Sequence, residues 1–235
     1  MRKILDPSRR QQLTALDGLY TTVVEQSLKG VKSDGEDGLE MSNWQRVIGM
    51  ILAVRSPLTV VEMDVLLGLP TDLLHTTWDF IDSLLPLLKV DTEKKAPVQL
   101  LHKSVFDFLT TQTRIPIDIA VGHRALAVDC LAFMNKNLKY DMSWISTSGR
   151  PSPPTVVTCS SEPCNGSALR YACRHFAKHL SDSALDQAPY TNQLRIFLTE
   201  HLLHWFELMA RIREIYKAEE SLKLLLVYLK VSSGV

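Results

Sequence analysis

The chain lacks any apolar run long enough to cross a bilayer, which takes about 20 consecutive apolar residues. Its first residues, up to Pro7, also lack the apolar core of a signal peptide. We therefore expect a cytoplasmic protein that makes no membrane contact. In that compartment its four cysteines stay reduced.

An excess of charge of either sign is also missing, because Lys+Arg and Asp+Glu both number 26. Binding to nucleic acid or to an anionic membrane depends on clustered cations, so the composition disfavours both partners. With 46% hydrophobic residues, the 235-residue chain can bury a core and form one large domain or two small ones.

Glycine motifs for phosphate binding are absent as well. The ten glycines are scattered, and neither G-x-x-x-x-G-K-[ST] nor G-x-G-x-x-G occurs. The nucleophile elbow G-x-S-x-G and the zinc helix H-E-x-x-H are also missing. The sequence therefore predicts no enzyme, no catalytic residue and no cofactor bound by this chain alone.

What the chain does contain is helical periodicity. Apolar residues recur at helical spacing over 9–28, 43–54, 59–67 and 72–85, and Thr59 with Glu62 fits a capping box. Period-two patterns at 87–91 and 98–101 then predict a β-hairpin, and a further helix starts near Val105. Three helices followed by a hairpin is the layout of a winged helix, which we expect over 41–115. The polar, acidic residues 31–40 before it read as a loop.

Residues 116–235 read as a helical domain. Helices are expected over 118–138, 168–180 and 192–230, the last with a break near Arg211 to Arg213. The proline- and serine-rich stretch 146–167 predicts a loop. The expected fold class is thus mainly α, with a winged helix followed by an α-helical bundle.

The junction between the second predicted strand and the next helix carries two basic residues, His102 and Lys103. Ser104 and Asp107 have the spacing of a capping box, which would start the helix at Val105. Free backbone N–H groups at a helix start attract anions. His102, Lys103 and Ser104 are therefore candidate anion contacts, although position alone favours ordinary solvated residues at a turn.

Two further groups of residues have less support. Cys159, Cys164, Cys173 and His175 include the usual zinc ligands, but their spacing is not a familiar one, and Cys173 falls on an apolar helix face. We predict no metal site. A second group makes one face of the 168–180 helix basic, and we expect that face to be solvated; the alternative is a surface facing a protein or a nucleotide. Its members are Arg170, Arg174, His175, Lys178 and His179.

DNA binding is the function that a winged helix first suggests. The third helix would enter the major groove. Here it carries Asp72, Asp79 and Asp82 without Lys or Arg, and would repel phosphates. Lys94 and Lys95 in the wing do not offset three carboxylates, so nucleic acid is a disfavoured partner.

A set of short motifs resembles the region that follows the NTPase core in fungal NACHT proteins. They are Leu16-Asp17-Gly18-Leu19-Tyr20, Trp44-Gln45-Arg46-Val47-Ile48-Gly49, Pro57-Leu58-Thr59, Leu66-Leu67-Gly68-Leu69, Leu100-Leu101-His102-Lys103-Ser104, Asp107-Phe108-Leu109, Leu169-Arg170-Tyr171-Ala172-Cys173, His179-Leu180 and Phe197-Leu198 through His201-Leu202-Leu203-His204-Trp205-Phe206-Glu207. Their order covers nearly the whole chain except 31–40 and about 146–165.

NACHT proteins are signal-transduction NTPases of the STAND type. The resemblance implies that residues 1–30 are the last helix of a NACHT core and that the winged helix and helical domain hold this core closed. In related plant proteins a histidine of a Met-His-Asp triplet contacts the β-phosphate of ADP. His102 matches that histidine, whereas Leu101 and Lys103 depart from the triplet.

The resemblance therefore predicts a non-catalytic regulatory segment that senses the nucleotide state of a core outside this chain. ADP or ATP would be bound only together with that core, in cis or in trans, and a repeat domain or another protein would be a further partner. The alternatives are a stand-alone protein-interaction module and, less favoured, a winged-helix DNA-binding protein.

Overall fold

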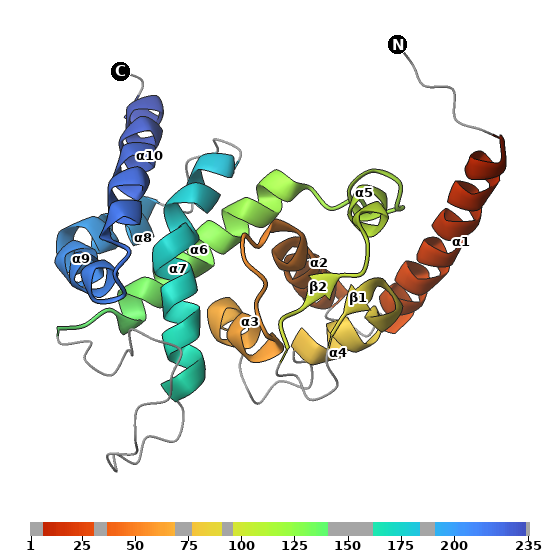
Figure 1. Cartoon of the computed structure of the whole chain (residues 1–235), viewed down its shortest axis with the longest axis horizontal. Coiled ribbons are helices and arrows are strands. Elements are labelled where there is room, and N and C mark those ends of the chain that lie inside the picture. Colours follow the sequence, from red (N-terminus) through yellow and green to blue (C-terminus); the bar gives the residue numbers. More distant parts are fainter. Residues whose placement is uncertain are drawn as a thin grey trace.

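A computed structural model describes residues 7–30, 37–68, 77–90, 96–140, 162–183 and 191–233. Over these ranges the chain is mainly helical and contains one two-stranded sheet, which confirms the predicted mainly α class. Helix α1 lies at one end of the molecule, helices α8 to α10 lie at the other, and α6 runs between them (Figure 1).

The N-terminal half follows the predicted order of helices and hairpin. Its elements are α1 (Pro7–Gly30), α2 (Asp37–Ala53), α3 (Val60–Leu67), α4 (Thr77–Asp82), a 3₁₀ turn (Leu85–Leu87), β1 (Leu88–Lys89), β2 (Gln99–Leu100) and α5 (Lys103–Thr111). The two strands are antiparallel, with Leu88 opposite Leu100 and Lys89 opposite Gln99. The Val98 N–H donates to the Leu58 carbonyl at 2.7 Å, which ties the hairpin to the segment before α3.

Helix α3 has the caps that its sequence indicates. The Thr59 hydroxyl accepts from the Glu62 N–H while the Glu62 carboxylate accepts from the Thr59 N–H, so the predicted capping box is confirmed. Gly68 ends the helix at φ +60°, a left-handed conformation that costs glycine little.

Two predicted boundaries in this half are wrong. Helix α2 begins at Asp37, so residues 37–40 of the expected acidic loop are helical, consistent with the stability that acidic residues give a first helical turn. Of the expected helix over 72–85, the described residues are helical over Thr77–Asp82, and its predicted end is wrong because Leu85 and Pro86 belong to a separate 3₁₀ turn. Residues 69–76 lie outside the described part of the chain.

The C-terminal half is helical as expected. Its elements are α6 (Ile119–Asn137), α7 (Glu162–Asp182), α8 (Thr191–Ile196), a π-helical turn (Phe197–His201), α9 (Leu202–Arg211) and α10 (Ile215–Ser233). The predicted break near Arg211 to Arg213 is confirmed, since Arg213 has φ +60° between α9 and α10. The loop predicted over 146–167 is wrong for 162–167, which form the first turns of α7, and 146–161 are outside the described residues.

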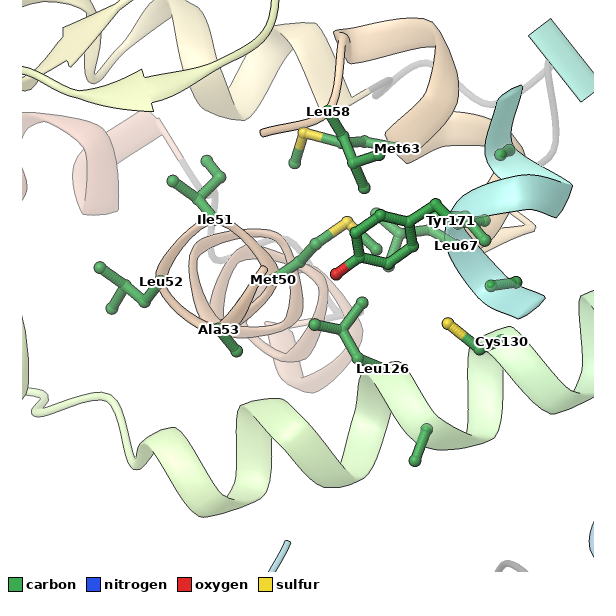
Figure 2. Close-up of a cluster of buried hydrophobic side chains, with 14 of the residues drawn as sticks. Met50, Ile51, Leu52, Ala53, Leu58, Met63, Leu67, Leu126, Cys130 and Tyr171 are labelled. Atoms are coloured by element: carbon green, nitrogen blue, oxygen red, sulfur yellow. The ribbon is translucent and has the colours of Figure 1, made fainter. Parts of the chain in front are cut away.

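The core joins the two halves through α2, α6 and α7, and side chains from α2, α3, α6 and α7 meet in it (Figure 2). Helices α2 and α6 cross with their backbones close together at two glycines. A Cβ atom added to Gly122 would lie 2.9 Å from the Gly49 carbonyl oxygen, so this crossing excludes a side chain at Gly122. Tyr171 reaches from α7 toward α2, near Leu126 and Cys130 of α6 (Figure 2).

Candidate functional site

The strand-to-helix junction at His102 is positioned by the hairpin. The Leu101 N–H donates to the Leu87 carbonyl at 3.0 Å, directly after β2. His102 then has extended backbone angles, φ −152° and ψ 154°, and α5 begins at Lys103. The side chains of Leu101, His102 and Lys103 are all exposed.

The residue that caps α5 is His102. Its Nδ1 atom accepts a hydrogen bond from the Ser104 N–H at 3.1 Å. The predicted capping box of Ser104 and Asp107 is therefore wrong, because the helix starts two residues before Val105 and Ser104 already lies in its first turn. An imidazole nitrogen here takes the role that Ser, Thr, Asp or Asn oxygens usually have.

The Ser104 hydroxyl connects the cap to α1. Its Oγ lies 2.8 Å from His102 Nδ1 and 2.9 Å from the Tyr20 hydroxyl. Tyr20 is buried and packs edge-on against Phe108, with ring centroids 5.5 Å apart. Tyr20 of α1 thus contacts the Ser104 hydroxyl, which in turn contacts the His102 imidazole.

These contacts determine which ring nitrogen of His102 carries the proton. A backbone N–H can only donate, so Nδ1 must be unprotonated while the cap is formed, and the neutral ring carries its proton on Nε2. The Nε2–H group is then the donor that an anion at this exposed junction would meet. Lys103 is next to it and adds a mobile positive charge.

Of the four residues with zinc-ligand side chains, Cys173 and His175 lie in the described part of the chain. Cys173 is fully buried, as its apolar face predicted, and burial raises its thiol pKa well above the ordinary value. Among the described residues no group of three or more His, Cys, Asp or Glu side chains could hold a metal ion. Cys159 and the side chain of Cys164 fall outside them.

The expected solvation of the basic face of α7 is wrong for His179, whereas Lys178 is exposed as expected. His179 has no exposed surface, Arg174 pairs with Glu214 at 2.7 Å, and Lys178 lies 3.5 Å from Glu220. The sequence showed only that these residues share a face, and a face of mixed His, Lys and Arg gives no signal that a neighbouring helix covers part of it.

Sequence reasoning also missed a buried ion pair between α2 and α6. Asp129 accepts a hydrogen bond from Arg46, and the Arg46 guanidinium also donates to the Leu67 carbonyl at 3.1 Å. Burial of Asp129 raises its pKa to about 6 even though Arg46 acts in the opposite direction. A signal was present, since Asp129 follows Leu126 by three residues on the apolar face of its helix.

Comparison of the chain with known protein families, with curated proteins and with solved structures finds no match. In the described part of the chain, the apolar helices also fall short of what crossing a bilayer requires.

Proposed function

We propose that this chain is a regulatory segment of a NACHT-type switch and that His102 senses the nucleotide held by a NACHT core outside the chain. The fold within it would be a winged helix, formed by α2, α3, α4 and the β1–β2 hairpin, followed by the helical domain. The chain itself carries out no hydrolysis, because none of its motifs holds a triphosphate.

The observation that supports this role is the fixed imidazole at the start of α5. His102 is exposed, its Nδ1 is held by the Ser104 N–H, and its Nε2–H is left to donate. A β-phosphate oxygen placed there would accept this hydrogen bond, and Lys103 would add attraction that salt weakens. The phosphate itself has to be held by the core, so this chain supplies only the donor side of the contact, through His102 and Lys103.

The test separates the two roles of His102. His102→Asn keeps a good N-cap acceptor but has no group that reaches as far as Nε2–H, whereas His102→Ala removes both. We expect ADP to strengthen binding of the wild-type chain to a purified NACHT core, measured by isothermal titration calorimetry. In His102→Asn, the increase in affinity that ADP causes should be about tenfold smaller, which corresponds to the loss of one charge-assisted hydrogen bond. The variant should keep the wild-type melting temperature.

His102→Ala is the matched control, because it should lose the ADP effect and also destabilise α5 by about 1 kcal/mol. The proposal fails if ADP has no influence on wild-type binding, or if His102→Asn keeps the full ADP effect.

A stand-alone protein-interaction module remains the second candidate function. Helix α10 exposes Tyr216, Leu226 and Val227, each with about 60% or more of its surface accessible. Large exposed apolar side chains on one helix mark protein contact surfaces. This function predicts that binding to a partner is independent of nucleotide and of His102, the opposite of the switch. DNA binding is disfavoured further, since α4 carries Asp79 and Asp82 and no cation.

A further inference from the structure

A chain of hydrogen bonds runs through the junction of α2, α6 and α7. The Arg55 N–H, just after α2, donates to the Tyr171 hydroxyl oxygen at 3.3 Å. The Tyr171 hydroxyl lies 2.8 Å from His179 Nε2, and His179 Nδ1 lies 2.9 Å from His123 Nδ1. At the far end His123 Nε2 lies 3.9 Å from the Asp182 carboxylate. We call these five residues the junction relay.

Only one arrangement of protons satisfies the junction relay. Tyr171 is buried, so its O–H needs an acceptor, and His179 Nε2 is the acceptor in reach. His179 must then carry its proton on Nδ1 and donate to His123 Nδ1. His123 is left with its proton on Nε2, facing Asp182. Both imidazoles are neutral in this arrangement.

A second proton on His123 would go to its Nδ1 atom, where the His179 Nδ1–H already points. Two N–H groups would then face each other across 2.9 Å, so the hydrogen bond between α6 and α7 would be lost. His179 has no exposed surface, whereas the His123 side chain keeps 13% of its own. His123 is therefore the member of the relay that water can reach.

The surrounding charges come from each element that packs against the relay. Arg55 pairs with Asp182, and the His175 ring lies tilted against Tyr171 with ring centroids 4.8 Å apart. Burial lowers the pKa of His123, and the positive charge of Arg55 lowers it further. The remaining facing groups are Cys130 of α6, Arg174 of α7, Glu214 before α10 and Lys217 of α10. The Asp182 carboxylate, 3.9 Å from His123 Nε2, is the acidic member of the relay, and its charge favours a protonated imidazole.

We propose that the junction relay is an acid-sensitive latch: uptake of one proton by His123 breaks its bond to His179 and loosens α6 from α7, the two helices against which the end of α2 packs. This latch connects the proposed winged-helix half to the helical domain. It does not depend on any nucleotide contact at His102, so it stands or falls separately from the proposed function.

The test is amide hydrogen exchange on the full chain, read by mass spectrometry at pH 7.5, 6.5 and 5.5 and corrected for intrinsic exchange rates. We expect opening at the junction segments 50–58, 117–125 and 175–183 to increase at least about tenfold per pH unit below 6.5, the effect of the one proton that His123 takes up on opening. Segment 98–110, around α5, should change much less. Equal increases in both regions would mean ordinary global unfolding and would overturn the latch.

His123→Asn is the matched variant. Its Oδ1 can accept the His179 Nδ1–H as the imidazole does, but it cannot take up a proton. The variant should show wild-type exchange at pH 7.5 and an acid response weaker by the contribution of one proton, and a wild-type pH response in this variant would contradict the proposal. If the variant does not fold, Asp182→Asn tests the same step. Loss of the Arg55 pair should raise junction opening at every pH, and loss of the carboxylate beside His123 should lower the pH at which opening begins to increase. An unshifted opening would count against the latch.

Discussion

At the scale of single residues, Asp129 is the side chain whose burial has the clearest energetic consequence. Its pKa rises from 3.8 to about 6, because the loss of hydration outweighs the attraction of Arg46. The folded chain therefore holds this proton over a pH range in which the unfolded chain has released it. Stability contributed by Asp129 is present at low pH and is lost as pH rises, by roughly 2 kcal/mol between pH 4 and pH 6.

Asp129→Asn tests the direction of this pH dependence of stability, because the amide resembles the protonated carboxyl and does not titrate. We expect the free energy of unfolding of the wild type, relative to the variant, to fall by roughly 2 kcal/mol between pH 4 and pH 7. Urea unfolding of both proteins across this range measures the difference, and contributions from other groups cancel. A difference that stays constant or rises with pH would show that Arg46 dominates the environment of Asp129.

At the scale of elements, the crossing of α2 and α6 depends on the absence of a side chain at Gly122. A Cβ atom there would meet the Gly49 carbonyl oxygen at 2.9 Å, which is backbone and cannot move aside without shifting a helix. We expect Gly122→Ala to destabilise the chain by about 1–3 kcal/mol, the usual cost of overpacking. Thermal and urea unfolding measure this change.

Gly18→Ala is the matched control for the same substitution. Gly18 lies within α1, and a Cβ added there meets nothing within 4 Å. Alanine should therefore stabilise the chain by about 0.5–1 kcal/mol through its higher helix propensity. If both variants shift stability in the same direction, the close approach of α2 and α6 is not what excludes a side chain at Gly122.

At the scale of the whole molecule, buried histidines make the fold sensitive to acid. Burial lowers the pKa of His179 to about 2 and that of His175 to about 4, and it lowers the pKa of His123 as well. The unfolded chain takes up these protons near pH 6.5 and the folded chain does not. The stability that these three histidines contribute is therefore fully present above pH 6.5 and is lost as pH falls below it.

His179→Gln isolates the largest of these contributions. The glutamine Oε1 can accept the Tyr171 hydroxyl without titrating. The variant should be less stable than the wild type at pH 7.5, since it loses the bond to His123, but its stability should fall less steeply in acid. We expect the slope of unfolding free energy against pH to differ between the two proteins by about 1.4 kcal/mol per pH unit between pH 6 and 4.5. Parallel curves from urea unfolding at each pH would refute this assignment.

The local elements followed from the sequence by itself. Helical spacing located most of the helices, Thr59 and Glu62 located the start of α3, and the pattern around Arg211 to Arg213 located the break between α9 and α10. Cys173 was correctly placed in the core from its position on an apolar face. These features depend on neighbours within a few residues, so periodicity and capping chemistry are enough to predict them.

The contacts between distant segments were decided only by the tertiary structure. Tyr20 meets Ser104 across 84 positions of sequence, and this contact, with His102 as the cap of α5, defines the candidate site. The burial of His179 against His123 likewise arises because α6 and α7 cross at that point. A sequence pattern tells which face of a helix is apolar, but the crossing of two helices determines which polar groups lose water and which find a partner.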